Sequence, residues 1–183
     1  MNGFNETALL DQLSNPKLRS IAFGKIVQEY QQPIYWHIRK MVLNHDDAND
    51  VMQTTFMKAW SALDSFRGES KISTWLFRIA VNETITFLNN QKSKNFYSTD
   101  NLEDSLAQNL EADHYFSGDE TQLKFQKAIL SLPEKQRLVF NMKYFDDLKY
   151  EEMEVILGTS VGALKASYHH AVKKIEAFLL RDL

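Results

Sequence analysis

Apolar residues recur at intervals of three and four along most of this chain, and that spacing restricts its fold more than any other feature. The clearest run lies between residues 45 and 63, where the apolar positions are Ala48, Val51, Met52, Phe56, Ala59, Trp60 and Leu63. Such intervals place side chains on one face of an α-helix. The 183 residues include only six Gly and three Pro, so few positions interrupt helices. We therefore expect an all-α fold.

Proline and glycine divide the periodic stretches into separate helices. Pro33 and Pro133 each suit the first turn of a helix, where the missing N–H costs nothing, so we expect a new helix to begin near each of them. Gly68 interrupts the pattern between two further helices. The expected helices are 18–30, one starting near 33, and then 45–63, 72–90, 122–130, 134–145, 150–157 and 161–180.

Negative charge is concentrated in the middle of the chain. Between residues 95 and 123 there are seven acidic residues and no Lys or Arg, so removing seven negative charges from the formal net charge of −3 leaves +4 for the remainder. The stretch also has weak periodicity and many Ser, Asp and Asn residues, which is typical of a linker. We therefore expect two small helical domains, 18–93 and 122–180, joined by a flexible acidic linker over 94–121.

Several classes of protein are excluded by what the sequence lacks. The absence of cysteine rules out disulfides and thiolate metal sites, and suits a reducing cytoplasm. No apolar run reaches the roughly 20 residues that span a bilayer, and no signal peptide is recognisable, so we expect a cytoplasmic protein without membrane insertion. There is no glycine-rich phosphate loop and no plausible catalytic triad. We expect no enzymatic activity, no metal and no cofactor.

The segment "LGTSVGALKASYHHAVKKI" near the C-terminus has the pattern of a helix-turn-helix. Gly158 can adopt the left-handed conformation of a tight turn, and the Ser160 hydroxyl is placed to cap the next helix. That helix has an apolar side and an opposite side of small, polar and basic residues, which lets its backbone approach DNA closely. An amphipathic helix that closes a bundle has the same pattern, so these residues alone leave both interpretations open.

Two longer stretches resemble the sigma-70 family of bacterial transcription initiation factors, and specifically its extracytoplasmic function (ECF) group. "DANDVMQTTFMKAWSALDSFRGESKISTWLFRIAVNETITFL" is similar to sigma region 2, with Asp-x-x-Gln-x-x-Phe, then Phe-Arg-Gly, then Trp-Leu-x-Arg-Ile-Ala-x-Asn. "LPEKQRLVFNMKYFDDLKYEEMEVILGTSVGALKASYHHAVKKI" is similar to region 4, with Leu-Pro-x-x-x-Arg, Glu-Glu and Leu-Gly-x-Ser. The two stretches occur in the family's order, on either side of a segment where the family has a variable linker.

The resemblance implies that the region 2 helix docks on core RNA polymerase. The residues that it implicates are Asp50, Gln53 and Phe56, with Met52, Thr54 and Met57 as neighbours. Exposed polar groups beside Met and aromatic surface suit a helix-to-helix interface. Without the resemblance, Asp50 and Gln53 would be assigned to an ordinary solvated face, and Met52 and Phe56 to the core.

The resemblance also implies that the loop after this helix holds a base extruded from the minus 10 promoter element. Polar contacts and stacking surface can offset the cost of extrusion. The implicated residues are Arg67, Glu69, Ser70, Lys71 and Thr74, followed by Arg78, Asn82 and Thr86 on the next helix. Trp75 could stack on a base, but it shares the spacing of Leu76 and Ile79 and is better assigned to the core.

Region 4 of the family binds the minus 35 element as duplex DNA through the second helix of the helix-turn-helix. Here the implicated residues are Ser160, Gly162, Ala163, Lys165, Ala166, Ser167, His169, His170 and Lys173, with Arg137 and Lys149 as phosphate contacts. Arg137 and Lys149 could equally be solvated surface charges.

The sequence departs from the family's pattern at three places. Glu154 stands where many ECF factors have a small residue at the crossing of the two helices, and a charge there needs solvent or a partner. Ser167 and His170 replace arginines, the usual readers of guanine. Thr86 and Asn89 replace Asp and Arg in region 2. With so few cations, we expect negligible promoter binding by the free protein at physiological salt.

The implied partners are core RNA polymerase and promoter DNA, bound by a monomer. An anti-sigma factor is common in the family, although no residue here encodes one. The alternatives are a homodimeric helix-turn-helix regulator that acts without polymerase, and a helical adaptor that never touches DNA. The linker could clamp the domains together, follow the polymerase exit channel, or act only as a solvated tether.

Overall fold

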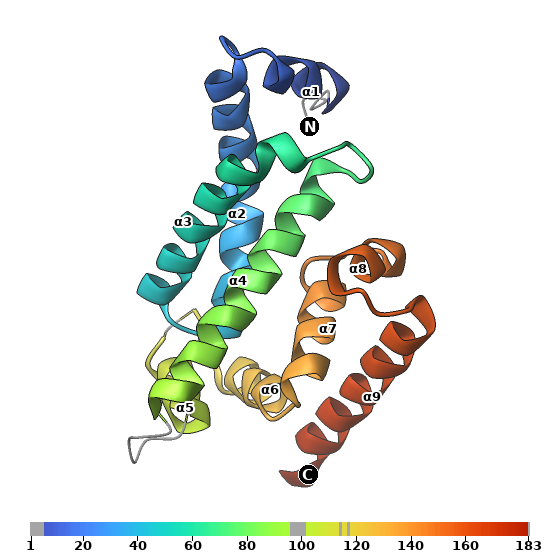
Figure 1. Cartoon of the computed structure of the whole chain (residues 1–183). Helices are drawn as coiled ribbons and strands as arrows, with labels where there is room; N and C mark the ends of the chain where they lie inside the picture. Colours follow the sequence, from blue (N-terminus) through green and yellow to red (C-terminus); the bar gives the residue numbers. More distant parts are fainter. Residues whose placement is uncertain (1–5, 96–101, 114, 117, 183) are drawn as a thin grey trace.

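The computed structural model describes residues 6–95, 102–113, 115–116 and 118–182, and within these ranges the chain is helical, with no strand. The all-α expectation is confirmed. The elements are α1 (Glu6–Ser14), α2 (Arg19–Val42), α3 (His45–Ala62), η1 (Leu63–Ser65), α4 (Ile72–Asn95), α5 (Leu102–Ala112), α6 (Glu120–Leu130), α7 (Glu134–Tyr144), α8 (Tyr150–Leu157), α9 (Val161–Leu179) and η2 (Leu180–Asp182). Figure 1 shows α2, α3 and α4 on one side and α7, α8 and α9 on the other.

Helices α2, α3 and α4 form the first group, with their apolar faces turned toward one another. Asn44 caps the start of α3, and its side-chain oxygen accepts hydrogen bonds from the backbone N–H groups of Asp46 and Asp47 at 2.9 and 3.1 Å. This cap satisfies N–H groups that the first turn leaves without helical partners. Residues of all three helices fill the core, among them Ile26, Ile34, Ile38, Val51, Phe56, Leu76 and Phe77.

The expected break at Pro33 was wrong, because α2 runs unbroken from Arg19 to Val42 with the proline inside it. Proline removes one helical N–H and crowds the preceding turn. Pro33 is exposed, so water can reach the carbonyl that loses its partner. The buried residues Ile26, Ile34 and Ile38 keep one face of the helix against the core on both sides of the proline.

Helices α6 to α9 form the second group. Its own core contains Ala128, Ile129, Leu132, Phe140, Ala171 and Ile175. The rings of Phe140 and Tyr168 stack with centroids 5.7 Å apart, which joins α7 to α9.

The acidic segment contains a packed helix where the sequence predicted only a linker. Helix α5 lies within it, and Leu106, Leu110 and Phe116 are buried together with Leu43, the residue that caps the C-terminal end of α2. Residues 94–95, 102–113, 115–116 and 118–121 of the expected linker are described, and 96–101, 114 and 117 lie outside the described residues.

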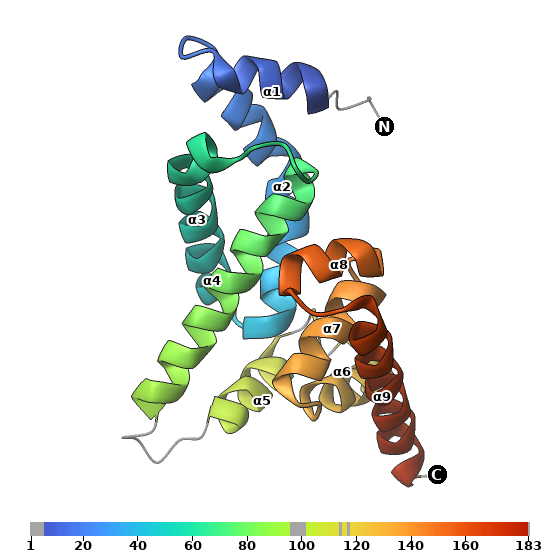
Figure 2. The same ribbon diagram turned by 45° about the vertical axis from the view of Figure 1, so that its right-hand side comes forward.

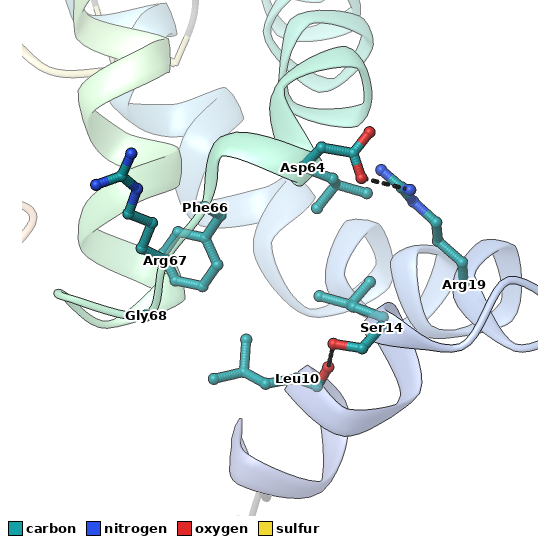
Figure 3. Close-up of a pocket in the computed structure, with 9 residues that line it drawn as sticks. Leu10, Ser14, Arg19, Asp64, Phe66, Arg67 and Gly68 are labelled. Atoms are coloured by element: carbon teal, nitrogen blue, oxygen red, sulfur yellow. Dashed lines mark hydrogen bonds and ion pairs between the residues drawn. The ribbon is translucent and has the colours of Figure 1, made fainter.

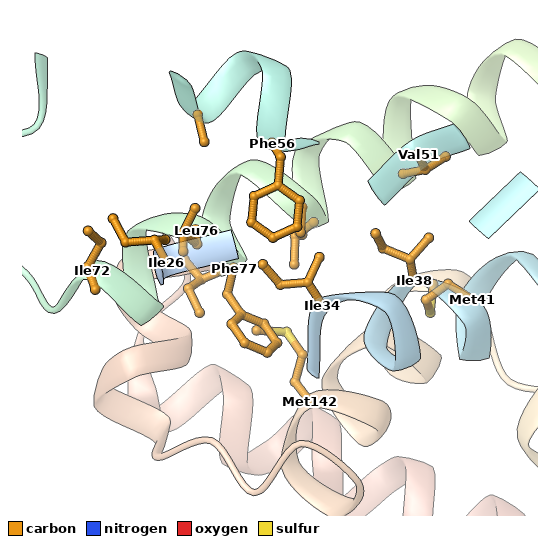
Figure 4. Packing of buried hydrophobic residues seen from close by; sticks show 14 of the residues in the cluster. Ile26, Ile34, Ile38, Met41, Val51, Phe56, Ile72, Leu76, Phe77 and Met142 are labelled. Atoms are coloured by element: carbon orange, nitrogen blue, oxygen red, sulfur yellow. The ribbon is translucent and has the colours of Figure 1, made fainter. Parts of the chain in front are cut away.

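The two groups pack against each other through a shared core. Met142 of α7 and Met153, Ile156 and Leu164 of the following helices join the cluster built on α2, α3 and α4. Figure 4 shows Met142 beside Phe77. Figure 2 shows α8 against α4, with α9 on the far side of α7 and α8. No helix in the described part of the chain is long and apolar enough to cross a membrane.

Candidate functional site

An apolar groove lies between α2 and α3 on the outside of the first group. Its cavity measures about 410 Å³ and is lined by Phe23, Val27, Gln31, Met52, Gln53, Phe56, Met57 and Trp60. Met57 is 71% exposed and Trp60 is 41% exposed. Phe56 is buried and forms the floor, where Phe23 meets it edge to face at 6.5 Å. Exposed Met and Trp side chains at a groove are typical of a protein-binding surface.

Four of the six residues expected to bind polymerase line this groove, namely Met52, Gln53, Phe56 and Met57. Asp50 and Thr54 lie beside it on the exposed ridge of α3, at the edge of a smaller hollow of about 180 Å³ that α3 shares with α4. The Thr54 hydroxyl donates to the Asp50 carbonyl at 2.9 Å. Asp50 and Met57 are two helical turns apart on the same ridge.

Sequence reasoning missed half of the groove. Phe23, Val27 and Gln31 come from α2, at spacings of four, and Trp60 was assigned to the buried stripe of α3. The spacing of Trp60 from Phe56 and Met57 places it on the same helix edge as both, which was the available signal. Trp60 also receives the guanidinium of Arg19 over its ring at 5.6 Å.

A second hollow of about 310 Å³ lies between α1 and the loop that follows α3. Leu10, Leu13 and Ser14 line it from α1, and Leu63, Asp64, Phe66, Arg67 and Gly68 from the loop, with Arg19 at its side. Figure 3 shows the Arg19 guanidinium beside the Asp64 carboxylate, a pair 2.7 Å apart. Gly68 has a φ of 71°, in the left-handed region that favours glycine.

The residues of this loop differ in their access to a ligand. Arg67, Glu69 and Lys71 are exposed, and Ser70 is half-buried. Arg78, Asn82 and Thr86 are exposed and follow one another at four-residue intervals along α4. Thr74 is only 5% exposed, so we leave it out of the proposed DNA contacts. Trp75 packs on Phe66 with ring centroids 5.0 Å apart and joins the core, as its spacing predicted.

Lys71 connects the loop to the second helical group. Its ammonium donates to the Glu152 carboxylate of α8 at 3.0 Å. Burial alone would raise the pKa of Glu152, but the backbone N–H of Lys149 and the ammonium of Lys71 outweigh it, so the pKa lies below its usual value. The loop and α8 therefore share a charge pair although they lie 81 residues apart.

The turn between α8 and α9 has the geometry expected of a helix-turn-helix. Gly158 ends α8 with a φ of 62°, and the Ser160 hydroxyl accepts from the backbone N–H of Ala163 at 3.4 Å. The charge of Glu154, which needed solvent or a partner at the helix crossing, has both. Its side chain is exposed, and its carboxylate accepts a hydrogen bond from the N–H of Val161 at 3.2 Å. Both acceptors hold the start of α9 in place.

The outer face of α9 carries the expected set of small, polar and basic residues. Leu164, Ala171 and Ile175 are buried on the inner face. Ser160, Gly162, Ala163, Lys165, Ala166, His169, His170 and Lys173 are exposed, and Ser167 is half-buried. The Lys165 ammonium lies 5.6 Å from the ring of Tyr150.

The two residues expected to contact phosphates differ in their exposure to solvent. Lys149 is exposed at the start of α8. Arg137 is 7% exposed within α7, so we leave it out of the proposed phosphate contacts.

Comparison with known proteins gives two family matches along the chain. Residues 26–94 match the model of sigma-70 region 2, and residues 122–175 match that of sigma-70 region 4. The chain is 34% identical over 172 residues to the ECF RNA polymerase sigma factor SigW of Bacillus subtilis, covering 88% of this chain and 90% of that relative. It is also 34% identical over 168 residues to the ECF RNA polymerase sigma-E factor of Escherichia coli, covering 85% of each.

Two solved structures share the fold. CnrH, in complex with the cytosolic domain of CnrY, superposes with a TM-score of 0.71 at 23% identity and covers 97% of this chain and 99% of that one. The sigma factor RpoE of Bartonella quintana, in complex with the anti-sigma factor NepR, gives 0.64 at 24% identity and covers 87% and 99%.

Proposed function

This chain belongs to the sigma-70 family and, within it, to the ECF sigma factors, and on that premise we propose that it binds bacterial core RNA polymerase and directs it to specific promoters. The observation that carries the proposal is the presence of regions 2 and 4 in order in one chain, each with its own exposed candidate surface. A homodimeric helix-turn-helix regulator has no need of region 2.

The groove between α2 and α3 is the proposed polymerase site. Met57 and Trp60 supply apolar area at its rim, and the ridge of Asp50, Gln53 and Thr54 supplies hydrogen-bonding groups beside it. An apolar centre with polar groups around it is the usual composition of a specific protein interface. We propose that this surface receives a helix of the polymerase.

The loop after α3 and the outer edge of α4 are the proposed minus 10 site. Arg67, Glu69, Ser70 and Lys71 lie at the loop, and Arg78, Asn82 and Thr86 continue along α4. Cationic and polar groups at these positions can hold an extruded base and its neighbouring phosphates.

The outer face of α9 is the proposed minus 35 site. Gly162, Ala163 and Ala166 let the helix backbone approach the duplex, while Lys165 and Lys173 supply positive charge. The face has no arginine, so we propose that close approach and DNA shape contribute more than arginine–guanine pairs.

We propose that one copy of the chain acts with each polymerase, in the cytoplasm where polymerase works. The complex of RpoE with the anti-sigma factor NepR supports an anti-sigma protein as a further partner.

The test combines the purified chain with core polymerase from the source organism and genomic DNA fragments. We expect a one-to-one complex and transcripts from a limited set of promoters. Lys165→Ala and His170→Ala should reduce those transcripts while sparing the complex, because both residues lie on the outer face of α9. Lys25→Ala, which removes an exposed charge from α2, is the control. Failure to form the complex, or dimeric binding to DNA without polymerase, would overturn the proposal.

A further inference from the structure

Helix α2 is held by two other parts of the chain near its C-terminal end. The acidic linker expected over 94–121, here called the acidic connector, contacts one face of it through Asp113, Tyr115 and Phe116, which we call the clasp residues. The turn between α7 and α8 contacts an adjacent face through Asp146. Both contacts join segments that are distant in the sequence.

The clasp residues bury an arginine of α2. Arg39 is 3% exposed, and its guanidinium pairs with the carboxylate of Asp113. The same guanidinium lies 4.8 Å from the ring of Phe116, which is 1% exposed. A charge that is removed from water this fully is tolerated only when it is paired, and the connector supplies the carboxylate that pairs with Arg39.

Aromatic and apolar contacts extend this attachment along the same face. The ring of Tyr115 stacks on Trp36 with centroids 4.3 Å apart. Trp36 and Arg39 are three residues apart and share one face of α2, and Leu43 directly follows the end of the helix. Leu43 is buried against Leu106 and Leu110 of α5.

The second contact is a buried charge cluster. Asp146 accepts from His37 Nδ1 at 2.6 Å and from Lys40 Nζ at 3.2 Å, and its side chain is 5% exposed. The Lys40 ammonium also lies 4.8 Å from the ring of Phe145. One turn earlier in α7, the Asn141 amide donates to the sulfur of Met41 at 3.4 Å.

We propose that the clasp residues of the acidic connector form an intramolecular clasp, which together with the Asp146 contact and the shared apolar core holds the two helical groups closed in the free chain and must release before both promoter elements can be bound. The closed state rests on these contacts and on the shared core that includes Met142, Met153 and Leu164. The need for release rests on the proposed function.

The two helical groups must separate because the closed chain is shorter than the distance between the two promoter elements. A compact chain of this length has a radius of gyration of about 16 Å and is about 40 Å across. The minus 10 and minus 35 elements are about 25 base pairs apart, which at 3.4 Å per pair is roughly 85 Å of duplex. The closed chain is too short to place the loop after α3 on one element and α9 on the other.

The absence of cysteine allows a direct distance measurement. Ser61→Cys on α3 and Lys174→Cys on α9 introduce two exposed labelling sites, one in each group. Spin labels at these sites, measured by double electron–electron resonance in the free full-length chain, should give one short distance. Adding Asp113→Ala with Tyr115→Ala should raise the population of long distances about tenfold or more.

The matched control is Asp104→Ala with Tyr144→Ala. It removes an exposed carboxylate from the connector and a half-exposed tyrosine whose ring partners, Phe125, Phe140 and Phe145, all lie in the second group. This control should keep the short distance. Circular dichroism should show equal helix content in all variants, which separates opening from unfolding.

Two results would overturn the clasp: long distances already dominating in the unmutated chain, or equal distance distributions for the clasp and control variants. Core polymerase and promoter DNA, added to the labelled chain, should convert the short distance to a long one. If the free-chain results hold but polymerase does not bind, the clasp stands and the proposed function falls.

Discussion

Asp146→Asn should weaken the contact between the two helical groups by about 3 kcal/mol. The carboxylate is nearly buried and accepts two hydrogen bonds from cationic or ionisable side chains, at 2.6 Å from His37 and 3.2 Å from Lys40. Removing one partner of a buried pair typically costs about 3–5 kcal/mol, because the charge that remains has lost its partner. Asparagine keeps one acceptor oxygen in nearly the same place, so we expect the lower end of that range.

The chain can respond to the loss of the Asp146 carboxylate in two ways, and each response is measurable. If the groups separate, His37 and Lys40 regain water, and the loss appears as a larger fraction of long distances between labels on α3 and α9. If they stay together, the loss appears as a lower free energy of unfolding in urea at constant slope. When the fraction of long distances is converted to a free energy, the two effects together should reach about 3 kcal/mol.

The neighbouring residue provides a matched control. Asp147 is 96% exposed and lies 3.5 Å from Lys143 of the same segment. Its φ of 49° is one that asparagine also adopts readily, so Asp147→Asn makes the same chemical change without burial or backbone strain. It should have no measurable effect. Equal results for the two variants would refute the reasoning that the buried cluster holds the groups together.

Three further predictions concern pH, the turn and the groove. Burial alone would raise the pKa of Asp146, but His37 and Lys40 outweigh it, so the pKa lies below its usual 3.8. The stability that the Asp146 carboxylate contributes is therefore fully present above pH 3.8 and is lost as the pH falls through the lowered pKa of the folded chain. Acid titration should then narrow the difference in free energy of unfolding between the unmutated chain and Asp146→Asn. Gly158→Ala should lower the free energy of unfolding by about 1 kcal/mol, since φ is 62° and no atom lies within 4 Å of the added Cβ, whereas Gly162→Ala, inside α9 with equal space, should not lower it. Trp60→Ala should weaken core polymerase binding about tenfold or more in a titration with labelled chain, while the exposed Ser61→Ala should not.

The helical periodicity of the sequence was sufficient to predict the all-α fold, because most helices have one continuous apolar face. It failed at Pro33, where a local rule about proline was given more weight than the stripe of Ile26, Ile34 and Ile38 that continues across it. It also failed at α5. There Leu106 and Leu110 are a helical turn apart, but the surrounding acidic and small polar residues concealed the pattern.

Burial and long-range pairing account for the remaining differences in the candidate site. Thr74 and Arg137 fit the pattern of surface contacts in the sequence, yet both are buried in the structure. The pairing of His37 with Asp146 joins residues 109 positions apart, which no local spacing can indicate. Met52, Gln53 and Met57 were predictable because they share one edge of a single helix, whereas the α2 side of the groove requires knowledge of which helices are neighbours.

The position of the groove between α2 and α3 has a kinetic consequence. In both ribbon views α3 lies on the far side of α4 from α8 and α9, so the groove is uncovered while the two helical groups are in contact. Polymerase can therefore capture the chain before the clasp releases, and opening becomes a unimolecular step that follows the encounter. Weakening the clasp should then leave the second-order association rate unchanged and shorten only the delay between capture and the first transcript.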